Sequence, residues 1–367
     1  MEERNINSRR SSFRIGLSVI LLMCCSPSTP KLVLPSAPQS VTDVTKIHQN
    51  FTPQVDILFV IANDSSMEDK QKVLAQNAAQ FTAAIFQNQV LDYHIGVINA
   101  VGAQQQGYNG IYGGRLYPVD QGNPNIYANY IDRSTPNAQA ALTKNLNVGY
   151  SADDPMALFD VVRRALTQPI INQENVGFFR PNAPLAIIFI SDTDPEDPTA
   201  ADNPDIFYKF LLNLKNGDAK KVSVYGVYDF SANAYGPGDG SGAPPGDCGG
   251  ESAPYMLDRL MVLAAPNSSR FYLCDTKFGQ QLASLSSKIV NSSTATTIEL
   301  SQRPVVSSIN VFYGTYSLPN DASTGWVYDP VSNSLVIGAN VTWPTNQPGG
   351  TELQVSYKAA ALPAQTN

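Results

Sequence analysis

The sequence predicts an α/β protein, in which a Rossmann-like, doubly wound and mostly parallel sheet is followed by a small all-β module at the C-terminus. From Val55 to about Val290, short apolar runs alternate with segments of helical periodicity, which favours parallel strands joined by crossover helices. After Ser293 this periodicity stops, and short β-prone runs follow, separated by Pro, Gly and Asn. With 367 residues, of which 43% are hydrophobic, the chain is large enough for two domains with real cores.

Four strands of the sheet are expected at residues 55–61, 93–99, 185–191 and 222–228. Their sequences are VDILFVI, YHIGVIN, LAIIFIS and VSVYGVY, which are nearly continuous apolar runs. Such runs are typical of strands that are covered on both faces. We therefore expect helices on both sides of the sheet.

Helical periodicity lies between the predicted strands. After the first strand, apolar side chains recur at helical spacing at Leu74, Ala78, Phe81 and Ile85. We expect Ser66 and Asp69 to cap the start of this helix. Further helices are expected at about residues 154–166, 204–214, 253–264 and 278–290.

The C-terminal module is expected over residues 298–362. Its β-prone runs are VVSSINVFY, GWVYD, SLVIGANV and ELQVSYKA, and they predict a sandwich-like arrangement. We expect Trp326 and Trp343 to pack in its core or at a strand edge. Stacking of these two side chains on a carbohydrate is the alternative.

The first residues resemble an export signal. Arg9, Arg10 and Arg14 precede the apolar stretch IGLSVILLM, which is shorter than a stable membrane-spanning helix requires. The sequence LLMCCS follows, and it resembles a bacterial lipoprotein signal, in which a cysteine after a short aliphatic run is acylated. We therefore predict a lipoprotein-type signal peptide over residues 1–24 and lipidation of Cys25. Lipidation of Cys24, or an ordinary cleaved signal without a lipid, are the alternatives.

This interpretation places the protein outside the cytoplasm. It would be an outer-membrane lipoprotein that faces the cell surface or the periplasm, with residues 25–50 as a linker. Cys248 and Cys274 lie in loop-like contexts, so a disulfide between them is expected in an oxidising compartment. The formal net charge is -7 and no basic patch is visible, which argues against nucleic acid as a partner.

The middle of the chain resembles a von Willebrand factor A domain. The matching pattern is VDILFVIANDSSM followed by a helix, then LAIIFISDTDPED, then VSVYGVY. The bacterial lipoprotein branch of this family also has a Gly/Pro-rich loop with a Cys, a Y..L helix, and a second Cys before D..FG..L..L. Here these features are Cys248, Tyr255 with Leu257, and the sequence CDTKFGQQLASL. The resemblance implies a domain of this type over residues 51–293.

Domains of this family carry a metal-ion-dependent adhesion site. It consists of an Asp-x-Ser-x-Ser turn after the first strand, a Thr from a second loop, and an Asp after a later strand. In this chain Ala62 stands in place of the leading Asp, Asp64 in place of the first Ser, and Ser66 matches the second. Asp192 matches the later Asp, whereas the second loop, GYSADDP, has no Thr and offers Ser151, Asp153 and Asp154 as substitutes.

Two interpretations of this departure remain open. In the first, the carboxylate has moved to Asp64, and the set Asp64, Ser66, Asp192 and Ser151 binds Mg²⁺ or Ca²⁺ with water completing the shell. In the second, the ion has been lost, and the fold is a metal-free binding scaffold.

The resemblance implies adhesion or protein–protein recognition through the top of the sheet. The partner would be a protein on another cell or in the envelope, and an intact site would capture its carboxylate through the cation. The alternative is a metal-free periplasmic scaffold or assembly factor of an envelope complex. The loop-rich segments 102–150 and 231–252 are either binding surfaces or surface elaboration.

Catalysis has little support in the sequence. The two histidines are His48 in the expected linker and His94 in an expected strand, and no nucleophile elbow, phosphate loop or metalloprotease helix is visible. We therefore expect a binding protein and not an enzyme. Asp192 and Asp194 match the start of a calcium-binding loop, but the glycine and glutamate of that motif are missing, and we expect a solvated acidic loop instead.

Overall fold

The computed structural model describes most of the chain from residue 44 onward. The described residues are 44–88, 90–101, 113–119, 129–150, 156–195, 203–228, 254–273, 275, 277–338, 340–344, 347 and 351–360. The predicted signal peptide, the lipidation site Cys25, the proposed disulfide between Cys248 and Cys274, and Ser151 lie outside these residues. Within the described part, no helix combines the length and apolarity that a membrane crossing requires.

The central feature is a five-stranded sheet in which every neighbouring pair is parallel. Its strand order is β3-β2-β4-β5-β6, so the chain first builds outward on one side of β2 and then crosses to the other. This confirms the predicted doubly wound α/β class. The strands are β2 (Gln54–Ile61), β3 (Asp92–Asn99), β4 (Leu185–Ser191), β5 (Val222–Tyr228) and β6 (Ser268–Tyr272).

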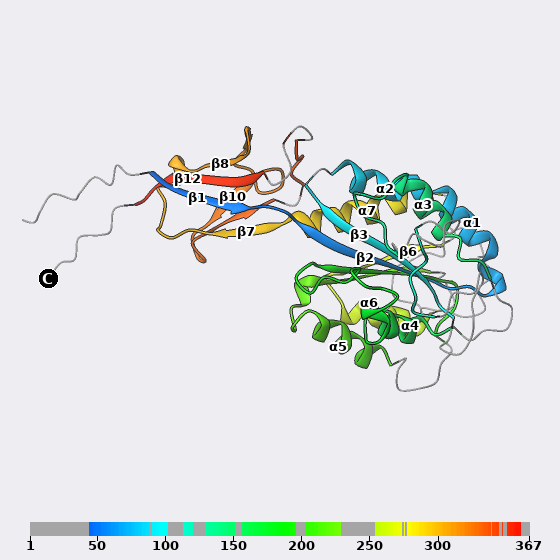
Figure 1. Cartoon of the computed structure of the whole chain (residues 1–367). Helices are drawn as coiled ribbons and strands as arrows, with labels where there is room; N and C mark the ends of the chain where they lie inside the picture. The colour runs from blue at the N-terminus through cyan, green and yellow to red at the C-terminus, as the bar shows by residue number, and fades with distance from the viewer. Residues whose placement is uncertain are drawn as a thin grey trace, which may run out of the picture. The chain divides into compact units, whose positions relative to one another are not determined.

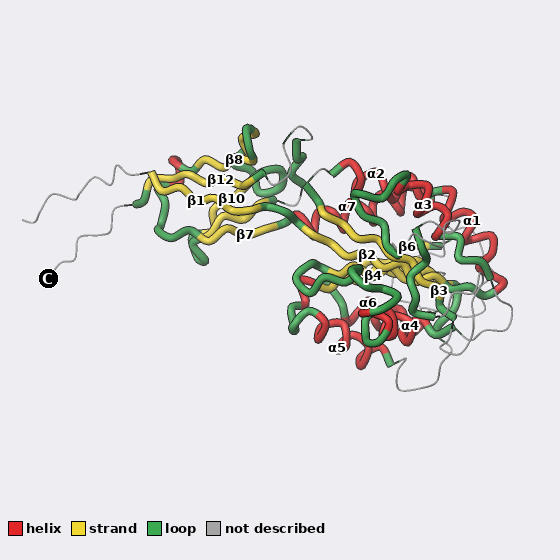
Figure 2. Tube along the Cα trace, viewed as in Figure 1, coloured by secondary structure: helices red, strands yellow, loops and turns green. Residues whose placement is uncertain are grey.

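Helices cover both faces of this sheet, and Figures 1 and 2 show the two helical layers with the strands between them. One layer contains α1 (Glu68–Gln76), α2 (Ala78–Gln87), α3 (Ala138–Asn145) and α7 (Phe278–Thr294). The other contains α4 (Leu158–Ala165), α5 (Pro204–Leu214) and α6 (Tyr255–Leu263). Short 3-10 helices are η1 (Ser65–Met67), η3 (Ile170–Asn172), η5 (Ala219–Lys221) and η6 (Val306–Ser308).

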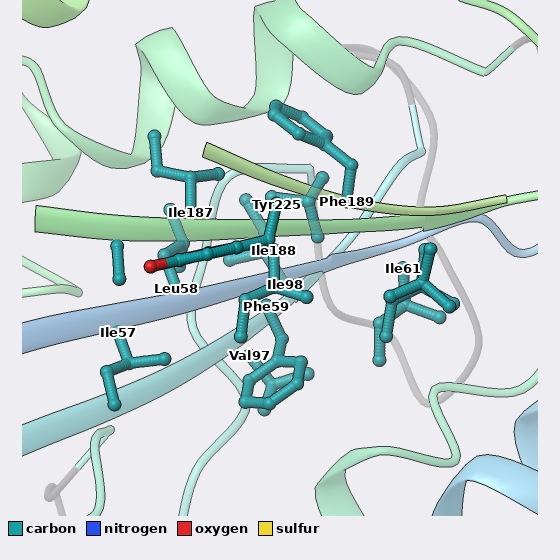
Figure 3. Packing of buried hydrophobic residues seen from close by; sticks show 14 of the residues in the cluster. Ile57, Leu58, Phe59, Ile61, Val97, Ile98, Ile187, Ile188, Phe189 and Tyr225 are labelled. Atoms are coloured by element: carbon teal, nitrogen blue, oxygen red, sulfur yellow. The ribbon is translucent and has the colours of Figure 1, made fainter. Parts of the chain in front are cut away.

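Apolar side chains of the strands project from both faces of the sheet into the buried core (Figure 3). There they pack against aromatic side chains of the helices. Phe59 of β2 meets Phe81 of α2 with a ring-centroid distance of 4.9 Å. Phe189 of β4 lies on the opposite face, where its ring is 5.6 Å from Phe159 of α4 and 6.1 Å from Phe207 of α5. Each such side chain stabilises the fold by roughly 1.5–3 kcal/mol when it is fully buried.

The first helical segment differs from the expectation of a single helix. The chain forms α1 and α2 with a break at Asn77, whose φ of -99° and ψ of 9° are not helical. Helix α7 passes close to this break, because a Cβ on Gly279 would lie only 2.5 Å from Asn77 Oδ1. The break between α1 and α2 therefore coincides with close packing against α7, and the spacing of apolar residues does not predict it.

The β module consists of two antiparallel sheets with the strand orders β1-β12-β8-β9 and β10-β11-β7. Side chains from both sheets share one apolar core, which is the arrangement of a sandwich. The strands are β1 (Val44–Asn50), β7 (Thr296–Glu299), β8 (Asn310–Tyr313), β9 (Tyr316–Leu318), β10 (Trp326–Asp329), β11 (Ser334–Ile337) and β12 (Glu352–Lys358).

Strand β1 lies within residues 25–50, for which the sequence predicts a linker. All seven of its residues pair antiparallel with β12, from Val44 opposite Lys358 to Asn50 opposite Glu352. The run VTKIHQN has too few apolar residues to predict a strand from the sequence. It is a strand because its backbone pairs with the distant strand β12. The module therefore contains residues from both ends of the described chain.

The two tryptophans pack in the core of the module, as expected. Trp326 is 3% exposed, and its indole N–H donates to the Leu318 carbonyl at 3.1 Å. Trp343 is 6% exposed, and its ring lies 4.5 Å from that of Phe51. The indole N–H of Trp343 has no hydrogen-bond partner among the described residues. Burial of both large rings in the core is a packing role.

Candidate functional site

The candidate site begins at the turn that follows β2. Ala62 still belongs to the sheet, because its N–H donates to the Ile190 carbonyl of β4 at 2.9 Å. Its methyl group is fully buried, and its carbonyl accepts a hydrogen bond from Gln71 Nε2 at 2.9 Å. At this position the chain therefore provides an apolar side chain and no oxygen ligand to the edge of the sheet.

Asp64 starts the turn that leads into the helices. Its carboxylate accepts a hydrogen bond from the Met67 N–H at 3.1 Å and caps the 3-10 helix η1. The prediction that Ser66 and Asp69 form a capping pair was wrong, since no side chain caps the start of α1. Asp64 is the N-cap residue instead, because its carboxylate accepts from the Met67 N–H at the start of η1, immediately before α1.

Ser66 joins two of the predicted ligands. Its Oγ lies 2.7 Å from Asp64 Oδ1 and 2.6 Å from Asp192 Oδ2, at hydrogen-bonding distance from both. A serine hydroxyl has one hydrogen and donates it to one carboxylate at a time. The structure thus brings together Asp64, Ser66 and Asp192, while the fourth predicted residue, Ser151, lies outside the described residues.

A lysine that is not among the predicted ligands completes this arrangement. Lys70, in the first turn of α1, forms a hydrogen-bonded ion pair with Asp192 Oδ2. The Asp192 side chain is fully buried, and that of Lys70 is only 12% exposed. Lys70 follows Ser66 by four residues, a helical spacing that could have revealed it. We call Asp64, Ser66, Lys70 and Asp192 the carboxyl-edge cluster.

The surroundings of Asp64 disfavour the ionised form of its carboxyl group. Burial raises the pKa of its carboxyl group above the ordinary value of 3.8, and the charge of Asp192 raises it further. Hydrogen bonds from Ser66 and from the Met67 N–H act in the opposite direction without cancelling these effects. Two carboxylates are therefore held close together at a cost in stability.

Several polar atoms around the cluster have no hydrogen-bond partner among the described residues. They are both amide atoms of Asn63, which is 1% exposed, together with Asp192 Oδ1 and Thr193 Oγ1. A buried polar group without a partner costs roughly 1–3 kcal/mol. In native proteins such a group needs an explanation, for example an ordered water, an ion or a functional role.

Gln71 connects the turn after β2 to the loop GYSADDP, in which Ser151 is the predicted ligand. Its Nε2 donates to the carbonyl of Gly149 at 3.0 Å as well as to that of Ala62, and its Oε1 accepts from the Gly149 N–H at 3.0 Å. Gly149 has a φ of 78°, which favours glycine. The side chain of Gln71 thus holds this loop next to the turn after β2.

The sequence predicts a solvated acidic loop after β4, but Asp194 in this segment is hydrogen-bonded to a helix. The carboxylate of Asp194 accepts hydrogen bonds from the N–H groups of Met256 at 2.9 Å and Leu257 at 3.3 Å. Met256 and Leu257 lie in the first turn of α6, where backbone N–H groups have no partner within the helix. Asp194 therefore caps α6 from another part of the chain.

The residues of the cluster fit a divalent cation only in part. Two carboxylates and a hydroxyl are the hard oxygen ligands that Mg²⁺ and Ca²⁺ prefer. The Lys70 ammonium does not fit, because it already bonds the Asp192 oxygen that faces Ser66. Within the described ranges, no group of three or more His, Cys, Asp or Glu side chains is placed to hold a metal ion.

Both histidines make structural contacts. His94 Nδ1 is 2.9 Å from the Phe178 carbonyl, and its ring lies 4.3 Å from that of Tyr130. His48, which belongs to β1, is 3.1 Å from Glu352 Oε2 on the neighbouring strand.

Comparison with known proteins gives similarity only among solved structures. No family model and no curated protein matches the chain. A von Willebrand factor type A protein from Catenulispora acidiphila has 12% identity and a TM-score of 0.36, over 90% of this chain and 68% of that one. Proximal thread matrix protein 1 from the mussel byssus has 12% identity and a TM-score of 0.34, over 66% of this chain and 48% of that one. The pilus adhesin SpaC from Lactobacillus rhamnosus GG has 12% identity and a TM-score of 0.34, over 86% of this chain and 40% of that one.

This chain spans about half or less of the length of the last two proteins. At these levels of similarity the fold class rests on the strand order and the helical layers of the chain itself. By these features the protein is an α/β protein with a doubly wound sheet and a hydrogen-bonded cluster at the carboxyl edge.

Proposed function

We propose that the protein recognises a partner protein through the carboxyl edge of its α/β sheet. The supporting observation is the carboxyl-edge cluster, in which Asp64 and Asp192 are held together around Ser66 although this raises the pKa of Asp64. Groups with perturbed titration gather at functional sites more often than elsewhere. The cluster also lies at the carboxyl ends of the neighbouring strands β2 and β4, from which the chain continues to strands on opposite sides of the sheet, β3 and β5; this is the usual ligand position in open α/β sheets.

The face is accessible at one point of the turn. Ser65 and Ser66 are exposed, whereas Asp192 beneath them is buried. A partner would therefore contact the serines and the start of α1 first, and the buried charges would shape the potential at that surface. The partner that this proposal requires is a protein ligand on another cell or in the envelope.

We also propose that the protein is exported and attached to the outer membrane through a lipid on Cys25, facing the cell surface or the periplasm. This part rests on the sequence of residues 1–25. We propose further that it is not an enzyme. The contacts of His94 with a backbone carbonyl and of His48 with Glu352 support this view, because each is a structural role for a side chain that catalysis often uses.

Site-specific photo-crosslinking in intact cells tests the recognition face. A photoreactive amino acid at Ser65 reports on the turn, and the same amino acid at Val331, which is 91% exposed in the β module, is the matched control. We expect a specific adduct at Ser65 that is absent at Val331. Equal labelling at both positions, or none at Ser65, would contradict the proposal.

The alternative function is a metal-free periplasmic scaffold or assembly factor. The ion pair between Lys70 and Asp192 favours a metal-free surface over the cation-bridged capture of a carboxylate. Protease treatment of intact cells distinguishes the two settings. A protein on the cell surface is cleaved, whereas a periplasmic scaffold is protected until the outer membrane is opened.

A further inference from the structure

We infer that Lys70 is an internal cation, whose ammonium group takes the place that a divalent ion would take in the carboxyl-edge cluster. The cluster is then assembled, and the fold is stable, without Mg²⁺ or Ca²⁺. This inference concerns how the face is held together. It does not depend on whether the face binds a partner.

The first argument is the demand for positive charge at Asp192. This carboxylate is fully buried, and a second carboxylate, that of Asp64, lies so near that the Ser66 hydroxyl is within hydrogen-bonding distance of both. A buried charge is tolerated only when it is paired and hydrogen-bonded. Lys70 provides the opposite charge, and its Nζ contacts the same oxygen, Oδ2, that Ser66 Oγ contacts.

The second argument is that Lys70 is much more buried than Lys72, its neighbour on the same helix. The side chain of Lys70 is 12% exposed, whereas that of Lys72 is 49% exposed. Lys72 pairs with Glu68 at 2.9 Å and Asp69 at 3.0 Å, which are surface contacts between residues one helical turn apart. Lysine is rarely buried unless it is paired, so the position of Lys70 indicates a specific role.

The third argument is competition for the same oxygen atom. A divalent ion at Asp192 Oδ2 would have to displace the ammonium group or remain beside it, and two cations in one partly buried cluster repel each other. Ala62 offers no carboxylate that could offset this repulsion. The cluster therefore has one cation already, and it belongs to the protein.

Thermal unfolding of the full chain tests the inference directly. We expect the midpoint of the wild-type protein to be the same in EDTA as in millimolar Mg²⁺, Ca²⁺ or Mn²⁺. Because an ion that binds only the native state raises the midpoint, an increase with any of these ions overturns the inference. This arm needs no variant and does not depend on the folding of a mutant.

Two variants test the role of the ammonium group, with Lys72→Met as the matched control. We expect Lys70→Met to lower the midpoint by several degrees more than Lys72→Met does, because it leaves Asp192 buried without a counter-charge. The double variant Lys70→Met/Asp192→Asn should recover most of this loss, since it removes both charges. Equal midpoints for Lys70→Met and Lys72→Met, or no recovery in the double variant, would overturn the inference.

A final measurement tests the exchange of one cation for another. In Lys70→Met the oxygens of Asp64, Ser66 and Asp192 are free of the ammonium group, so we expect Mn²⁺ to raise its midpoint. The double variant lacks one carboxylate and should respond less. If Lys70→Met unfolds at the same temperature with and without Mn²⁺, the ammonium group does not take the place of an ion.

Discussion

Asp64 and Asp192 are bridged by a single hydroxyl group, that of Ser66, which lies 2.7 Å from one carboxylate and 2.6 Å from the other. The two acids come from the turn after β2 and from the end of β4, which are neighbouring strands of the sheet. Their proximity is a consequence of parallel pairing, because the carboxyl ends of parallel strands meet at one edge.

This proximity makes Asp64 destabilising when it is ionised. We expect Asp64→Asn to raise the free energy of unfolding at pH 7 by roughly 0.5–1 kcal/mol, a value that allows for solvent screening. The amide oxygen can still accept from Met67 N–H and from Ser66, so the cap is retained. Urea unfolding of both proteins at neutral pH measures the difference.

The same pair predicts a pH dependence with a definite sign. Since the pKa of Asp64 is raised above 3.8 in the folded protein, the folded state holds the proton more tightly than the unfolded state. Stability contributed by this group is therefore lost as the pH rises from 3.8 through the folded pKa. The wild type and Asp64→Asn should converge below pH 3.8 and separate above it. The exposed Asp69→Asn is the control, and a similar divergence in that variant would refute the assignment to Asp64.

Lys215 predicts a second pH effect, at alkaline pH. Burial lowers its pKa from 10.5 to about 8, although the charge of Asp56 opposes this shift. Between about pH 8 and 10.5 the unfolded chain holds a proton that the folded chain has released, so the contribution of Lys215 to stability increases with pH in this window. In Lys215→Met this increase should disappear, whereas Lys209→Met, on the surface of α5, should keep it. Chemical denaturation between pH 7.5 and 10 measures both.

Asp56 and Arg180 form a buried ion pair at the amino end of the sheet. Asp56 is fully buried and accepts from Arg180 Nε at 2.8 Å and from the Arg180 N–H at 2.7 Å. We expect Asp56→Ala to cost about 2–3 kcal/mol in the free energy of unfolding, because Arg180 loses the buried acceptor of two hydrogen bonds and keeps only its ion pair with Asp92 at 2.7 Å. Urea unfolding at pH 7 measures this loss.

The exposed pair of Asp205 and Arg259, at 2.9 Å, provides the matched comparison. Asp205→Ala should cost much less than Asp56→Ala, because a surface ion pair is screened by solvent and contributes little to stability. If the two alanine variants lost similar free energy, burial would not be the factor that makes the Asp56 pair important.

Asp194 predicts a local effect on α6. Its carboxylate accepts from two N–H groups of the first turn of this helix, so Asp194→Ala should cost about 1–2 kcal/mol. We expect faster hydrogen exchange at Met256 and Leu257, with little change in α5. Unchanged exchange at these two amides would show that the cap contributes nothing to the helix start.

The sequence predicted those parts of the fold in which local pattern and packing agree. Strand β4 and helix α5 begin and end where expected, at Leu185–Ser191 and Pro204–Leu214. The first has an uninterrupted apolar run, and the second begins with Asn203, which caps it, and a proline at its first position. Strand β6, with the sequence SSRFY, and helix α3, with AQAALTKN, lack such patterns and were not predicted.

The candidate site was predicted in part. Asp64, Ser66 and Asp192 were expected together and lie together, because the strand ends that carry them are adjacent. Lys70 was missed, since only its four-residue spacing from Ser66 distinguishes it in the sequence from its solvent-exposed neighbour Lys72. The metal-binding role of the cluster, the lipid on Cys25 and the disulfide of Cys248 with Cys274 stay predictions.

By itself, then, the sequence determined the alternation of strands and helices, the position of the turn after β2 and the apolar side chain of Ala62 at the start of that turn. These are local properties of composition and spacing. Only the tertiary structure decided that Lys70 faces inward to Asp192 and that β1 pairs with β12. The physical reason is that charge pairing and strand pairing join residues far apart in the chain, and their energies depend on burial and distance, which no local pattern contains.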